Sequence, residues 1–163
     1  MISIRLSNLL MYGTAIALGA VSYVALNANP ELALLPHKTA LEYLYNYSFV
    51  FVENVGYQQT NGLFIIGQSC LGAKLFINLF LIMVLGFIHR YRDVTRQIIA
   101  LIKFYFLALA LACGITIIRI ASSLPFCTWD NFHLIHNTLS LSIYFISGLA
   151  LYFVMERKTM SRA

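Results

Sequence analysis

The chain has 163 residues, of which 60% are apolar and 10% are charged, and its formal net charge at pH 7 is +5. Its mean hydropathy is +0.78. Soluble domains typically carry about 25% charged residues, so this composition excludes an ordinary soluble domain and predicts an integral membrane protein. The positive charge does not favour a nucleic-acid partner, because the basic residues lie beside apolar segments, where they orient membrane proteins.

Four apolar segments are each long enough to cross a bilayer, which takes about 20 residues in a helix. They predict an all-α, polytopic membrane helical bundle forming one domain over residues 1–163, with spans at 9–26, 69–88, 97–121 and 132–155. The first span ends before Pro30, where a helix should stop. A cleaved signal peptide is the alternative for this segment, since Leu26-Asn27-Ala28 weakly matches a cleavage site.

The segment at 31–68 is less apolar, and aromatic residues alternate there with polar ones. Tyrosine suits the membrane–water interface, so we expect residues 37–52 to form a helix lying on the outer leaflet or dipping into it. Residues 56–62 have the composition of a turn. Residues 63–66 are too short to span a membrane, which leaves a strand-like or re-entrant piece leading into the second span.

Basic residues gather at one end of the predicted spans. The positive-inside tendency places this end in the cytoplasm, so the segment 31–68 and the loop after the third span face outward, and both chain ends face inward. Eight of the eleven basic residues belong to the inner face: Arg5, Arg90, Arg92, Arg96, Lys103, Arg157, Lys158 and Arg162.

Cys70 stands where the second span begins. Ser69 is a good helix N-cap residue, so we expect Cys70 in the first helical turn, close to free backbone N–H groups and to the positive end of the helix dipole. Such a position favours the thiolate, which is the reactive form of cysteine. The alternative is a small hydrophobic residue packed at the membrane boundary, and Cys113, within the third span, is expected to be inert core.

Two further residues share the outer end of the spans with Cys70. Arg119 is about one turn from the end of the third span, and His136 is about one turn inside the fourth. At a rise of ~1.5 Å per residue, all three lie within roughly 10 Å of the outer interface. A thiol, an imidazole and a guanidinium in one layer suit nucleophilic acyl transfer. An arginine in a span costs at least ~2.5 kcal/mol to insert, which favours a functional role for it.

Each of these residues has a structural alternative: Arg119 snorkels outward, and His136 is a satisfied core histidine. His133 shares the helical face of His136 and competes for its role. Lys74, one turn after Cys70, is expected to contact lipid phosphate more than to activate the thiol.

Other chemistries fit these residues less well. A metal site of Cys70, His133 and His136 lacks an obviously placed carboxylate. A haem would need two histidines on the same side of the membrane, but His89 is predicted at the inner end and His133 and His136 at the outer end. A membrane thiol oxidase needs paired cysteines, and only Cys70 and Cys127 lie outside. A disulfide between these two would disable the nucleophile. We therefore expect no cofactor and no metal.

Three short stretches, taken in order, resemble motifs of the exosortase/archaeosortase family of membrane transpeptidases, most closely its short form, exosortase K. Gly56-Tyr57 followed by residues 65–72 is similar to the family's Ser-Cys-x-Gly box, and residues 117–123 resemble its arginine box. Residues 136–144 resemble a His-x-x-x-Gly-x-x-x-aromatic pattern, in which Ser140 stands where glycine is expected. Lys74 also departs from the family, where a small or amide side chain is commoner.

The resemblance, which covers roughly residues 40–155, implies a cysteine protease-like transpeptidase in a prokaryotic cytoplasmic membrane. Its partners would be exported proteins carrying a C-terminal sorting signal with a transmembrane helix, and a lipid or glycan acceptor for the new C-terminus. By the resemblance, Cys70 forms a thioester, His136 acts as acid and base, and Arg119 steadies the tetrahedral intermediate. The competing class is a non-catalytic membrane scaffold in which these residues are structural.

Overall fold

Helices dominate the computed structural model, which describes residues 2–62, 64–91, 93–127, 129 and 131–160. Four of its helical segments are long and apolar enough to cross a membrane, and they lie at Leu6–Ala28, Gln68–Arg90, Val94–Phe126 and Leu134–Arg157. The predicted all-α polytopic bundle is confirmed at this level. The α-helices are α1 (Ile2–Ala28), α2 (Pro30–Tyr45), α3 (Ala73–Phe87), α4 (Val94–Ser123) and α5 (Phe132–Met160).

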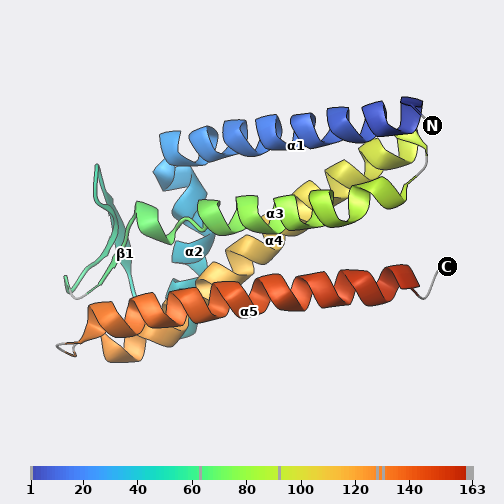
Figure 1. Cartoon of the computed structure of the whole chain (residues 1–163). Coiled ribbons are helices and arrows are strands. Elements are labelled where there is room, and N and C mark those ends of the chain that lie inside the picture. The colour runs from blue at the N-terminus through green and yellow to red at the C-terminus, as the bar shows by residue number, and fades with distance from the viewer. Residues whose placement is uncertain (1, 63, 92, 128, 130, 161–163) are drawn as a thin grey trace.

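The four long helices run side by side, and α2 crosses at one end of them (Figure 1). The small sheet lies at this same end, which we call the sheet end. The first turn of α1, the last turn of α5 and the connection between α3 and α4 lie at the opposite end (Figure 1). The chain therefore passes through the sheet end at two places, before α3 and between α4 and α5.

Helix α3 forms the centre of the bundle. In its most apolar stretch 61% of the residues are buried, whereas none are buried in the corresponding stretch of α5. The rings of Phe76 and Phe80 stack at 6.0 Å and both meet the edge of Tyr105 on α4, at 5.3 and 5.7 Å. Tyr105 also exchanges a 2.9 Å hydrogen bond with Ser22 of α1. The exposed apolar side chains of α5 suit a helix that faces lipid on most of its surface.

Gln97 holds the opposite end of the bundle together. Its side chain is 1% exposed, and it accepts a 2.6 Å hydrogen bond from the Ser7 hydroxyl. Its amide group donates to Asn8 Oδ1 at 2.8 Å and to the Tyr91 carbonyl at 2.9 Å. Inside a membrane such polar side chains link helices, because hydrocarbon offers them no other partner.

The segment before α3 is partly a sheet, which corrects the prediction of a helix over 37–52. Helix α2 ends at Tyr45, Asn46 takes a left-handed conformation (φ 54°), and a strand follows. The alternating Phe49-Val50-Phe51-Val52 favours a strand because its side chains point alternately to the two faces. An antiparallel sheet in the order β1-β2-β3 results, made of β1 (Phe49–Val52), β2 (Gly56–Gln59) and β3 (Ile65–Ile66).

Residues 56–62, predicted as a turn, are therefore half strand. The chain reverses between β1 and β2, where Asn54 and Gly56 have φ values of 63° and 115°. It reverses again between β2 and β3, near Gly62 (φ 73°). The strand-like alternative for the last piece is correct for Ile65–Ile66, whereas Leu63 lies outside the described residues.

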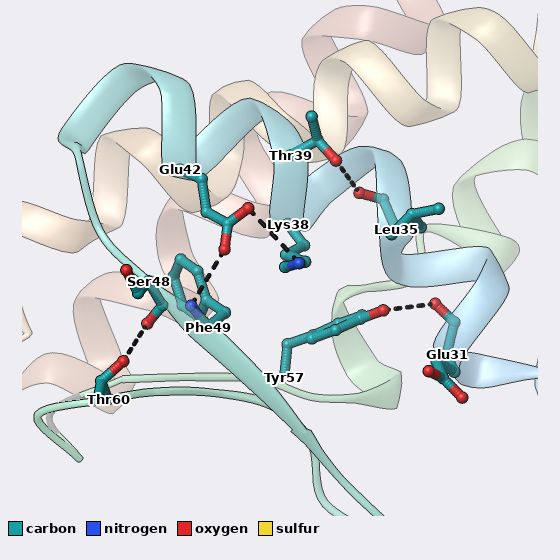
Figure 2. A network of polar contacts seen from close by, with 9 residues as sticks. All are labelled: Glu31, Leu35, Lys38, Thr39, Glu42, Ser48, Phe49, Tyr57 and Thr60. Atoms are coloured by element: carbon teal, nitrogen blue, oxygen red, sulfur yellow. Dashed lines mark hydrogen bonds and ion pairs between the residues drawn. The ribbon is translucent and has the colours of Figure 1, made fainter.

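Helix α2 is fastened to the sheet by polar contacts (Figure 2). Glu42 accepts a 3.1 Å hydrogen bond from the backbone N–H of Phe49 and pairs with Lys38 at 3.6 Å. The hydroxyl of Tyr57 donates to the Glu31 carbonyl at 3.3 Å. On its other side α2 packs against α4, where the Tyr45 hydroxyl donates to the Ala121 carbonyl at 2.9 Å. The helix thus lies between the sheet and the bundle.

Candidate active site

Cys70 does not open a helix, which corrects the prediction made from Ser69. It is the last residue of a 3-10 turn, Gln68–Cys70, which we call the Cys70 turn, and α3 begins at Ala73. Gly72 is the N-cap of α3 and has a left-handed φ of 68°. The backbone N–H of Cys70 donates to the Gly67 carbonyl at 2.9 Å. The free N–H groups of α3 therefore come after Cys70, and the helix-dipole argument for a thiolate does not apply here.

The side chain of Cys70 is 5% exposed. It belongs to an apolar cluster at the sheet end, to which α2, the sheet and α4 contribute residues such as Leu41, Ile66 and Ile120. Cys113 and Cys127 are half-buried, and all three cysteines are free thiols. Cys127 packs against the same cluster as Cys70, so the two outer cysteines predicted from sequence do share one end of the molecule.

Arg119 links the Cys70 turn to α5. Its guanidinium is buried, at 5% exposure, rather than snorkelling outward. One terminal nitrogen, Nη2, lies 3.5 Å from the Ser69 carbonyl, and the other, Nη1, lies 3.4 Å from the Ser140 hydroxyl. The group also stands over the ring of Tyr144, 5.5 Å from its centroid. These are long hydrogen bonds, so the guanidinium is positioned between two elements without being saturated by either.

His136 contacts the same Ser140 hydroxyl as Arg119 does. It is half-buried on α5, its ring packs on that of Phe132 at 5.5 Å, and its carbonyl accepts a 2.6 Å hydrogen bond from the Ser140 hydroxyl. Because the Ser140 hydroxyl contacts both Arg119 and the backbone carbonyl of His136, Ser140 connects two of the predicted site residues.

The two competing residues are placed differently. The side chain of His133 lies outside the described residues. Lys74 is exposed on the first turn of α3, as expected for a residue that meets lipid headgroups.

Two buried polar residues of this layer had no sequence signal. His37 of α2 is 2% exposed, and neither ring nitrogen makes a hydrogen bond of normal geometry. Burial, and then the charge of Arg119, lower the pKa of His37 from 6.5 to about 4, and the Ala33 carbonyl opposes this with a smaller effect. Thr116 of α4 is fully buried, and its hydroxyl has no partner. Thr116 lies three residues before Arg119 on α4, whereas His37 is brought to the layer of Arg119 by the packing of α2 on α4.

Two hollows adjoin the site. A cavity of about 630 Å³ at the sheet end is lined by α2, the β1–β2 hairpin and Gln68 of the Cys70 turn, and it includes the carboxylates Glu31 and Glu53. A groove of about 780 Å³ runs between α3 and α5, which we call the α3–α5 groove. It is lined mostly by leucines and aromatic residues and includes Tyr144, the residue beneath Arg119.

Among the residues that the structure describes, no three His, Cys, Asp or Glu side chains gather where they could share a metal ion. The metal alternative that includes His133 lies partly outside this set. Comparisons with protein-family models, curated proteins and solved structures give no match to this chain. The residues and their geometry therefore carry the functional argument.

Proposed function

We propose that the chain is a membrane-embedded cysteine transpeptidase of the exosortase/archaeosortase type. It would cleave a C-terminal sorting signal on exported proteins and transfer the new C-terminus to an acceptor. The observation that supports this proposal is the position of Arg119, a buried cation held between the Cys70 turn and the α5 turn that carries His136. A thiol, a guanidinium and an imidazole at one end of a bundle are the groups that acyl transfer requires.

The residues would act in two steps. The Cys70 sulfur attacks the scissile carbonyl after His136 takes its proton, and Arg119 stabilises the negative oxygen that forms. His136 then gives the proton to the leaving amine, the peptide bond breaks, and a thioester remains on Cys70. In the second step an acceptor amine or hydroxyl attacks the thioester, its proton passes to His136, and the thiolate of Cys70 leaves and is reprotonated.

The α3–α5 groove supplies a place for the membrane helix of such a substrate. Its lining is mostly apolar, and it leads to Tyr144 below Arg119. Gly148 lies in the groove, where an added Cβ would make an ordinary van der Waals contact with Ile82 at 3.6 Å. A helix lying in this groove would bring the residues that precede it to the level of Arg119.

The competing function is that of a membrane scaffold, and the burial of Cys70 favours it. An apolar environment disfavours the thiolate, and a thiol packed in a core is usually inert. The two functions differ in one measurable property, which is the reactivity of this thiol.

The test is the rate of Cys70 labelling by a membrane-impermeant thiol reagent as a function of pH, in a Cys113→Ala, Cys127→Ala background. The enzyme predicts a midpoint clearly below the ordinary thiol pKa of about 8.5 that rises in Arg119→Ala and His136→Ala. Lys74→Gln serves as the matched control, since it removes an exposed charge at the same end. Slow labelling that neither variant changes, together with unaltered processing of every exported protein in Cys70→Ala cells, would support the scaffold.

A further inference from the structure

Arg119 is a buried charge without an opposite charge. Its side chain is 5% exposed, and it makes no ion pair with a carboxylate among the described residues. Its two hydrogen bonds are long, at 3.4 and 3.5 Å, and its Nε has no partner. A buried cation is expensive unless something of opposite charge or with strong acceptors compensates it. The contacts given for Arg119, including the Tyr144 ring 5.5 Å from the guanidinium carbon, supply no opposite charge.

Two more buried polar side chains that make no hydrogen bond of normal geometry lie on α2 and α4, the elements that pack around Arg119. Thr116 precedes Arg119 by three residues on α4, so both side chains lie on one helical face. His37 comes from α2, which packs on α4 and on the Cys70 turn, and it lies near enough to Arg119 for the guanidinium to lower its pKa. Buried polar groups in folded proteins nearly always have a partner, so three neighbouring exceptions point to a missing ligand.

The chemistry of the three groups defines that ligand. A guanidinium and a threonine hydroxyl donate hydrogen bonds, and a neutral imidazole donates one from whichever nitrogen carries the proton. Such a set without any carboxylate suits an oxyanion, and arginine in particular matches phosphate oxygens. Arg119 precedes the last residue of α4 by four positions, about 6 Å along the helix, which is close to headgroup depth.

We infer that Arg119, His37 and Thr116 form a binding site for a phosphoryl oxyanion at the contact between α2 and α4, beneath the Cys70 turn. The ligand occupies the resting site, and in the proposed reaction the transient oxyanion takes its place at Arg119. Gly72, the N-cap of α3 that follows the Cys70 turn, closes the site on one side, since it packs directly on the Thr116 hydroxyl and leaves no room for a Cβ. The source of the phosphoryl oxyanion is either free phosphate or the phosphate of an anionic lipid.

The experiment measures the thermal unfolding midpoint of the full chain in two settings. In neutral detergent micelles, sodium phosphate replaces sodium chloride at constant ionic strength. In nanodiscs, phosphatidylcholine alone is compared with phosphatidylcholine containing phosphatidylglycerol. A saturable rise in the micelles identifies free phosphate as a ligand, and a rise only with phosphatidylglycerol identifies the lipid phosphate.

Variants assign the effect to this site. Thr116→Val and His37→Gln should each weaken the apparent affinity about tenfold, because each removes or misplaces a hydrogen bond to a charged ligand. Lys74→Gln, which removes an exposed charge near the same end, should bind as the wild type does. The inference is overturned if neither phosphate nor phosphatidylglycerol stabilises the chain, or if Lys74→Gln loses as much affinity as Thr116→Val.

A measurement on the unmodified chain covers the case in which a variant fails to fold. With isotope-labelled histidine, four ring signals are expected, one for each histidine of the chain. The signal that titrates at the lowered pKa of about 4, expected for His37, should move saturably as ligand is added, with the same midpoint as the thermal effect. A titration that leaves this signal in place would contradict the site.

Discussion

At the scale of single residues, burial decides how His37 responds to pH. Its pKa is lowered to about 4 in the folded chain, whereas in the unfolded chain it is 6.5. Between pH 6.5 and about pH 4, His37 therefore binds a proton in the unfolded chain but not in the folded chain. The free energy of unfolding falls as the pH drops through this range, and the loss is complete near pH 4. A shift of this size corresponds to a loss of about 3 kcal/mol.

His37→Phe should remove this part of the pH dependence, because phenylalanine fills the same buried position without titrating. The measurement is the free energy of unfolding in phosphate-free detergent solution at pH 7 and pH 4.5, for the wild type and the variant. The wild type should lose more stability between the two values, by about 2 to 3 kcal/mol. Equal losses would show that His37 is already protonated or solvated in the folded chain.

The site also shows which residues a sequence can reveal. Cys70, Arg119 and His136 were predicted as site residues because each is unusual near the end of an apolar span, and the structure connects their turns through Ser69 and Ser140. His37 and Thr116 gave no signal, since a histidine in a semi-polar segment and a threonine in a span are both ordinary. The position of His37 beside α4 depends on how two helices pack, which cannot be predicted from a single sequence.

At the scale of elements, the long helices were predictable and the short ones were not. Hydropathy over some 20 residues averages out local detail, so the four spans follow from it directly. The strand Phe49–Val52 was missed because its aromatic side chains also suit an interfacial helix. The start of α3 was misplaced because Ser69 has the chemistry of an N-cap, whereas Gly72 supplies the left-handed residue at which the chain turns into the helix.

The attachment of α1 to the bundle makes an element-scale prediction. Gln97 forms three side-chain hydrogen bonds, two of them to Ser7 and Asn8 of α1. Gln97→Leu keeps the volume but leaves these partners unsatisfied, and should lower the free energy of unfolding by about 1 to 3 kcal/mol. Denaturant unfolding in micelles measures the loss, and Gln68→Leu, at an exposed position of the Cys70 turn, is the control. An unchanged stability would mean that α1 is held by its apolar contacts alone.

At the scale of the whole molecule, the two ends of the bundle differ in their secondary structure and in their basic residues. The sheet, α2 and the candidate site lie at one end, while Arg90, Arg96 and the last turns of α5 lie at the other (Figure 1). Two of the basic residues that supported the predicted orientation, Arg92 and Arg162, lie outside the described residues. The positive-inside tendency nevertheless applies to those that remain, because they flank apolar helices.

This division predicts the orientation in the membrane, and therefore the compartment in which the site works. Single cysteines are introduced as Asn54→Cys in the exposed β1–β2 turn and as Arg157→Cys in the exposed end of α5, in a chain whose own cysteines are replaced by serine. In intact cells a membrane-impermeant reagent should label position 54 at once and position 157 only after the membrane is permeabilised. Moving the charges of the basic end across the bilayer is costly, so we expect this end to stay in the cytoplasm and the two positions to respond in opposite ways. Labelling of position 157 in intact cells, with position 54 protected, would place Cys70 on the cytoplasmic side, where a sorting signal of an exported protein does not arrive.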